Sequence, residues 1–335
     1  MPFEKIGDPA KTVLQDMEAY HYSALLSDRF WIFSRKYKEQ PHHNWGHRIC
    51  FSGGYSAYFD IASKQWSSKE DFAAISNEEN LEEALFVFNS HIFLLLYTGF
   101  GGIKFQNLFR WDFGERNWSK ISDFQVEPSN NLVVQEANTH SALIVVRQEQ
   151  GVKDSIHLVS VVGDVIRVHK LSVDDRHASL SLVHGVSLSN KLGLYTPIMA
   201  ARWGDDIYMI GGVHGCGFHF EPKKWIWFDL KTKTSEVIEI TDDAPPFRFS
   251  GSSYVKVLPN GLWVHATGSV QRGMTNSVFN GEIWTVNLKS KPLKWKKCGI
   301  VVPETDREEL VIAISDAGMV YVADNHRGIF AANLE

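Results

Sequence analysis

Short apolar runs recur along the chain, and each ends at glycine, asparagine, aspartate or another turn-forming residue. The runs are RFWIFSRK (29–36), HIFLLLYTG (91–99), SALIVVRQ (141–148), DIYMIGG (206–212), GLWVHATG (261–268) and GMVYVAD (318–324). Their apolar positions are nearly continuous rather than alternating, so we expect strands that are buried on both faces. Their recurrence indicates an internal repeat, in which each run is the second strand of its unit.

A second pattern lies downstream of several of these runs and predicts a strand, a polar turn and a returning strand. Asp60 lies six residues before Trp66 in YFDIASKQW, and Asp112 lies six residues before Trp118 in RWDFGERNW. Looser copies are WFDLKTKTSEV (227–237), around Asp229, and WTVNLKSKPLKW (284–295), around Asn287. Aspartate and asparagine at such positions are typical of tight turns, because their side chains bond to nearby backbone N–H groups.

Together the two patterns predict six units of four strands each. We therefore expect an all-β chain folded as a single six-bladed β-propeller, with four-stranded antiparallel blades. The predicted blades cover residues 21–72, 84–126, 131–173, 196–242, 250–300 and 308–335, the last joined by residues 2–9. Segment 174–195 has no clear blade, and the pattern leaves open whether it is an insertion or an extra strand pair.

The last unit stops before an outer strand, and the beginning of the chain offers a replacement. PFEKIGDP (2–9) resembles LKWKKCGI (293–300) and NWSKISDF (117–124), which are predicted outer strands. An N-terminal strand in that place would close the ring and cover a sheet edge. The best helical candidates are short, DPAKTVLQDMEAY (8–20) and SNEENLEEALF (76–86).

Composition and charge narrow the class of protein. The 335 residues are 44% apolar and 22% charged, which is typical of a globular chain. Acids and bases are mixed, with a net charge of -5, so a nucleic-acid partner is not expected, although a local patch of either sign remains open. The longest apolar run is too short to cross a bilayer. Because Cys50, Cys216 and Cys298 are far apart, we expect neither a disulfide framework nor a cysteine zinc site, and we predict a cytoplasmic or nuclear location.

The motifs resemble the kelch repeat, whose marks are a Gly-Gly pair, a Tyr/Phe-x-Asp strand and a later tryptophan. Residues 204–240 match best through Gly211, Gly212 and Asp229, with Val237 near the place of the tryptophan. The matches in other units are partial: Gly53, Gly54, Asp60 and Trp66 in the first, and Gly101, Gly102, Asp112 and Trp118 in the second. The resemblance implies a propeller that binds a protein or peptide, as a substrate adaptor of a ubiquitin ligase or a subunit of a complex.

The connections between second and third strands are the longest, and long connections are where binding residues concentrate. Candidate partner-binding residues in these connections are His42, His43, Trp45, Arg48, Phe100, Lys104, Phe105, His214, Phe218, His219, Arg272 and Arg327. Arginines suit acidic peptides, and aromatic residues anchor interfaces. For any single residue the alternative is equally open: the loop packs over the ring, and its aromatic side chains form a small local core.

The sequence predicts no catalytic residues, no metal and no cofactor. Clustered histidines such as His42, His43 and His47 match no established metal-binding spacing. The glycine-rich stretches do not lead into a helix that would hold phosphate.

The leading hypothesis is therefore a non-enzymatic protein-interaction scaffold with no membrane partner, whose oligomeric state the sequence leaves open. The alternative is an enzyme acting on a sugar or small metabolite at the central channel. A third interpretation, a subunit of an obligate complex, predicts a large exposed apolar patch.

Overall fold

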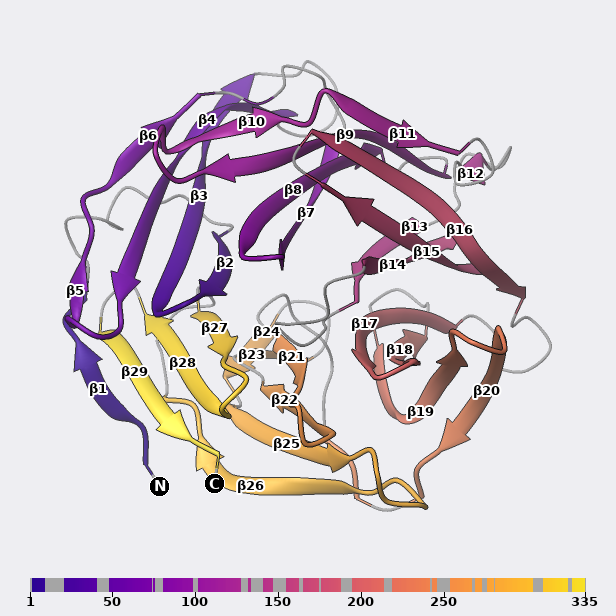
Figure 1. Ribbon diagram of the computed structural model, residues 1–335. Coiled ribbons are helices and arrows are strands. Elements are labelled where there is room, and N and C mark those ends of the chain that lie inside the picture. The colour runs from indigo at the N-terminus through magenta and orange to yellow at the C-terminus, as the bar shows by residue number, and fades with distance from the viewer. Residues whose placement is uncertain are drawn as a thin grey trace.

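The computed structural model is a closed ring of six β-sheets around one axis (Figure 1). It describes residues 2–9, 21–40, 48–73, 75, 81–98, 102–127, 132–133, 141–146, 155–162, 165–174, 176–187, 195–213, 219–241, 243–245, 254–266, 269–272, 276–279, 281–303, 310–324 and 327–334. Within these ranges there are strands, turns and bends but no helix, and hence no helix that could span a membrane. The predicted six-bladed β-propeller is confirmed.

Each blade starts with an innermost strand and adds strands outward. Blade one holds β2 (His21–Leu26), β3 (Arg29–Gln40), β4 (Arg48–Asp60) and β5 (Gln65–Trp66), with β6 (Glu70–Phe72) also on β4. Blade two holds β7 (Leu81–Phe88), β8 (His91–Thr98), β9 (Gly102–Asp112) and β10 (Asn117–Lys120), with β12 (Leu132–Val133) on β9. Blade three holds β13 (Ser141–Val145), β14 (Ile156–Val162), β15 (Val165–Val173) and β16 (His177–Ser187).

The other three blades follow the same order. Blade four holds β17 (Tyr195–Trp203), β18 (Asp206–Val213), β19 (His219–Asp229) and β20 (Thr234–Glu239). Blade five holds β21 (Tyr254–Val257), β22 (Leu262–Ala266), β25 (Glu282–Asn287) and β26 (Trp295–Val301). A separate hairpin, β23 (Ser269–Arg272) and β24 (Asn276–Phe279), lies between β22 and β25 in sequence. Blade six holds β27 (Leu310–Ile314), β28 (Met319–Asp324) and β29 (Gly328–Asn333).

The ring closes through the N-terminal strand, as the sequence predicts. Strand β1 (Glu4–Gly7) pairs antiparallel with β29, with Glu4 opposite Ala331 and Lys5 opposite Phe330. The two marked chain ends lie side by side in Figure 1. Blade six is therefore completed by residues from the two ends of the chain.

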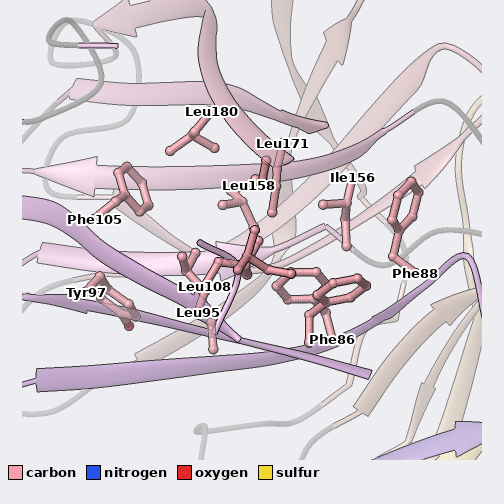
Figure 2. Packing of buried hydrophobic residues seen from close by; sticks show 14 of the residues in the cluster. Phe86, Phe88, Leu95, Tyr97, Phe105, Leu108, Ile156, Leu158, Leu171 and Leu180 are labelled. Atoms are coloured by element: carbon pink, nitrogen blue, oxygen red, sulfur yellow. The ribbon is translucent and has the colours of Figure 1, made fainter. Parts of the chain in front are cut away.

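The hydrophobic core lies between the blades, with one buried cluster at each of the six interfaces. Strand β8 shows how one strand serves two clusters. Phe93 and Leu95 pack toward blade three, whereas Ile92 and Leu94 pack toward blade one. Figure 2 shows the cluster between blades two and three, where residues such as Phe86 face their counterparts across the interface. This two-sided burial explains the nearly continuous apolar runs in the sequence.

Two expectations about individual strands were wrong. Residues 81–86 form the beginning of strand β7 instead of a helix, and residues 141–145 form the innermost strand of blade three instead of its second strand. The sheet of blade three consequently extends to Ser187, so segment 174–195 contains its fourth antiparallel strand. A fifth strand, β11 (Asp123–Val126), runs parallel to β16 at its outer edge. The proposed helix at 8–20 falls almost entirely outside the described residues.

Candidate functional site

The innermost strands surround the axis and define two different ends of the ring. Going around the axis they follow the order β2, β7, β13, β17, β21 and β27, and each contacts the next. The strands of a blade alternate in direction, so connections from second to third and from fourth to first strands leave one end. We call this the loop end. The connections from first to second and from third to fourth strands lie at the opposite end, which we call the turn end.

Acidic residues on the innermost strands are confined to one place. Across all six of these strands, the acidic residues are Glu82 and Glu83, at the beginning of β7 and therefore at the loop end. Glu82 is exposed and Glu83 is half-buried. Neighbouring residues of a strand point to opposite faces, so the two carboxylates lie on different sides of the blade. The residue two positions after Glu82, Ala84, packs toward blade three.

Glu82 begins a row of side chains that crosses blade two on the side facing blade three. It lies opposite Tyr97 on β8, and Tyr97 lies opposite Phe105 on β9. Tyr97 is 5% exposed and Phe105 is 4% exposed, and both belong to the cluster between blades two and three. The ring of Phe105 lies edge-on to His169 of blade three, with ring centroids 5.4 Å apart. The strand that carries the exposed carboxylate is therefore supported by buried aromatic side chains.

The structure describes only some of the side chains expected to bind a partner. His42, His43, Trp45, Phe100, His214 and Phe218 lie outside the described residues. For Arg48, His219 and Arg272 it places the backbone, in β4, β19 and β23. Lys104 and Arg327 are exposed, and the Arg327 backbone N–H donates to Asp324 at 3.0 Å. Phe105 is buried, so it stabilises the blade interface and is not available to a partner.

Three buried histidines were possible acid–base groups, but their surroundings keep them neutral. Burial lowers the pKa of His157, His169 and His265 to about 3. The Nε2 atom of His169 lies 2.6 Å from the hydroxyl of Ser160, and both side chains are fully buried. This Ser–His pair is inaccessible to substrate and joins β14 to β15.

Asp112 and Asp316, two carboxylates at the turn end, have structural partners. Asp112 Oδ1 accepts the backbone N–H groups of Gly114 at 2.8 Å and Glu115 at 3.0 Å, and these bonds hold the carboxyl pKa below its usual value. The ammonium group of Lys256 on β21 lies 2.5 Å from Asp316 in the first turn of blade six. No cluster of three or more histidine, cysteine, aspartate or glutamate residues that could hold a metal occurs in the described part of the chain.

Comparisons with known proteins find similarity in structure but not in sequence. No family model matches, and no curated protein matches. An α-L-arabinofuranosidase from Fusarium graminearum, solved with an iminosugar inhibitor, aligns over 100% of this chain and 98% of its own, at TM-score 0.54 and 12% identity. An exo-β-1,3-galactanase from Clostridium thermocellum aligns over 93% of this chain and 72% of its own, at TM-score 0.50 and 11% identity. A fungal copper-bound alcohol oxidase aligns over 99% and 76%, at TM-score 0.51 and 7% identity.

At 7–12% identity these likenesses establish the fold and assign no activity to this chain. They also overturn the leading hypothesis from the sequence, because the similar structures are enzymes and two of them are glycosidases. The expectations of a non-enzymatic scaffold and of a ubiquitin-ligase adaptor were therefore wrong. In the described residues, the exposed large apolar side chains are Phe113 in blade two and Val301 in blade five, and no large apolar patch is formed there.

Proposed function

We propose that the protein is a glycoside-cleaving enzyme whose site lies at the loop end, beside the beginning of β7. The observation that carries the proposal is the position of Glu82, an exposed carboxylate on an innermost strand at that end. The whole-chain likeness to an arabinofuranosidase, and the likeness to a galactanase, support sugar as the substrate class.

Glycosidic bonds are commonly cleaved between two carboxyl groups, one protonating the leaving oxygen and the other acting as nucleophile or as base toward water. Glu82 suits the second role, because its exposed carboxylate is open to an incoming sugar or water. Glu83 points to the other side of the strand, so the two do not flank one bond. The proton donor in this proposal comes from another element at the loop end.

The test is hydrolysis of aryl glycosides, including the α-L-arabinofuranoside and β-D-galactoside, together with release of sugars from plant polysaccharides. We expect Glu82→Gln to lower kcat by about 10²–10⁴-fold, since the amide cannot act as base or nucleophile. Glu236→Gln is the matched control, because Glu236 is exposed on β20, an outer strand away from the axis. Absence of hydrolysis across the panel, or equal rates for wild type and Glu82→Gln, contradicts the proposal.

We also propose that the blades are degenerate relatives of the kelch repeat. Support comes from Gly211 and Gly212 near the end of β18 and from Asp229 at the end of β19. Asp60 and Asp112 occupy the same final position in β4 and β9.

A further inference from the structure

Blade five has a charge opposite to that of the rest of the chain. Between Tyr254 and Val301 there are seven lysines and arginines and one acidic residue, Glu282. This segment has a formal charge of +6, and the remaining residues carry -11, because the total is -5. A local field of this sign attracts polyanions even when the whole protein is acidic.

Most of this charge is concentrated at one corner of the blade. Five lysines fall within the nine residues KSKPLKWKK, 289–297, which form the turn after β25 and the beginning of β26. Strand β26 is the outermost strand of its blade, at the rim of the ring (Figure 1). The lysines are exposed, whereas Leu293 and Trp295 between them are buried and anchor the segment. We call Lys289, Lys291, Lys294, Lys296 and Lys297 the lysine ridge.

Packing orients two of these ammonium groups, and aromatic rings take part in both cases. Lys297 forms an ion pair with Glu282, and its Nζ lies 6.0 Å from the ring centroid of Trp284. The Nζ of Lys289 lies 5.8 Å from the ring centroid of Trp203, which belongs to blade four. Contact with an aromatic face holds an ammonium group without cancelling its charge.

Protection of a sheet edge explains only part of the ridge. Lysines on edge strands prevent pairing between molecules, and this accounts for Lys296 and Lys297 on β26. It does not account for Lys289 and Lys291, which lie in the turn and outside the ladder. The equivalent turn and outer strand contain two basic residues in blade two (113–120) and two in blade four (230–239), against five lysines in 289–297.

We propose that the lysine ridge binds an anionic polysaccharide, a chain bearing sulfate or carboxylate groups, at the turn end of blade five and away from the proposed site of cleavage. The choice of a polysaccharide among polyanions rests on the proposed function. Ammonium groups act as point charges for such anions. The tryptophans of β25 and β26, Trp284 and Trp295, are 7% and 6% exposed, so neither offers an open ring for stacking of an unpaired nucleic-acid base, and Trp203 of blade four is half-buried.

The experiment measures binding of the full chain to heparin fragments, which carry both sulfate and carboxylate, at low and at raised salt. The test variant is Lys289→Gln/Lys291→Gln/Lys294→Gln/Lys296→Gln, which leaves the Lys297–Glu282 pair intact. The matched control removes the same charge at exposed lysines elsewhere, Lys64→Gln/Lys120→Gln/Lys223→Gln/Lys233→Gln. We expect the test variant to lose affinity by about 10-fold or more and to show a shallower salt dependence, with the control close to wild type.

Several outcomes would overturn the proposal. Equal losses in both variants would show that net charge alone matters, and absence of heparin binding by the wild type would remove the ligand class. Ridge-dependent binding to duplex DNA or phosphatidylserine vesicles, without binding to heparin, would assign the surface to another polyanion. The Glu82→Gln variant separates this proposal from the enzyme: heparin binding equal to wild type is expected whether or not hydrolysis is found.

Discussion

One kind of turn is repeated at the ends of the third strands. In five blades an aspartate or asparagine ends the strand or follows it directly, and its side-chain oxygen accepts backbone N–H bonds from the turn. These residues are Asp60, Asp112, Asp174, Asp229 and Asn287. In three of these turns a basic residue four positions later closes the turn in the left-handed region, Lys64 at φ 58, Arg116 at φ 47 and Lys233 at φ 57. The repeat pattern predicted four of the five positions and did not include Asp174, which has no aromatic-Asp signature before it.

These turns make a defined contribution to acid sensitivity. Hydrogen bonds from the backbone lower the pKa of the four aspartates in the folded protein. Their stabilisation is therefore present above the unfolded pKa and is lost as pH falls through the folded pKa. Replacing all four with asparagine keeps the acceptor oxygen and removes the titration. We expect this variant to lose less stability than wild type between neutral pH and about pH 3, in urea unfolding series. Glu236→Gln is the control and should lose stability as wild type does. If the four-asparagine variant loses as much stability on acidification as this control, the assignment is contradicted.

At the scale of strands, the sequence predicted most of the order but misassigned two inner strands. In LEEALF the local preference of leucine, glutamate and alanine for helix is overridden by packing: Leu81 and Leu85 face blade one, while Ala84 faces blade three. SALIVV was misplaced because first and second strands are both buried on two faces. Their sequence patterns are alike. The sheet order distinguishes them, because β13 pairs with β14 and with no other strand and is therefore innermost.

The closure by β1 depends on a glycine in β29. Gly328 has φ 116, and a Cβ atom there would lie 2.3 Å from the carbonyl oxygen of Gly7. We expect Gly328→Ala to lower the free energy of unfolding by at least about 2 kcal/mol, because the backbone strain adds to the clash. Gly299→Ala on β26 is the control, since nothing lies within 4 Å of a Cβ there. Hydrogen exchange should show faster exchange of the β1 amides in Gly328→Ala, and unchanged protection of β1 would refute the explanation.

At the scale of the whole molecule, stability comes from the interfaces between blades. The Lys256–Asp316 pair joins blades five and six, and the lysine side chain is 7% exposed. Removing one partner leaves a buried charge, so we expect Asp316→Ala to cost about 2–4 kcal/mol in denaturant unfolding. Lys256→Met/Asp316→Ala should recover much of this loss, whereas Lys231→Met, which breaks an exposed pair with Asp205, should cost little. A double variant as unstable as Asp316→Ala would rule out charge burial as the cause.

The candidate site was less predictable than the ring. The repeat indicated which connections share the loop end, because strand order fixes their direction. Glu82 was missed because its segment was interpreted as a helix, in which an exposed glutamate is unremarkable. The lysine ridge is visible in the sequence as KSKPLKWKK, but the well-mixed charge of the whole chain obscured it. The burial of Leu293 and Trp295 anchors the segment and leaves all five lysines exposed, with Lys296 and Lys297 on opposite faces of β26.

The pairing of β1 with β29 bears on how the protein is made. Strand β1 precedes every other described strand and β29 follows them, so β1 has no hydrogen-bonding partner until residues 328–333 have been synthesised. Closure must wait until residues 328–333 have left the ribosome, and any nascent or truncated product that lacks them leaves β1 without a partner and β28 with an open edge. Such incomplete products expose unpaired strand edges, so we expect them to bind chaperones. A circular permutant in which β1 directly follows β29 would make closure independent of this delay.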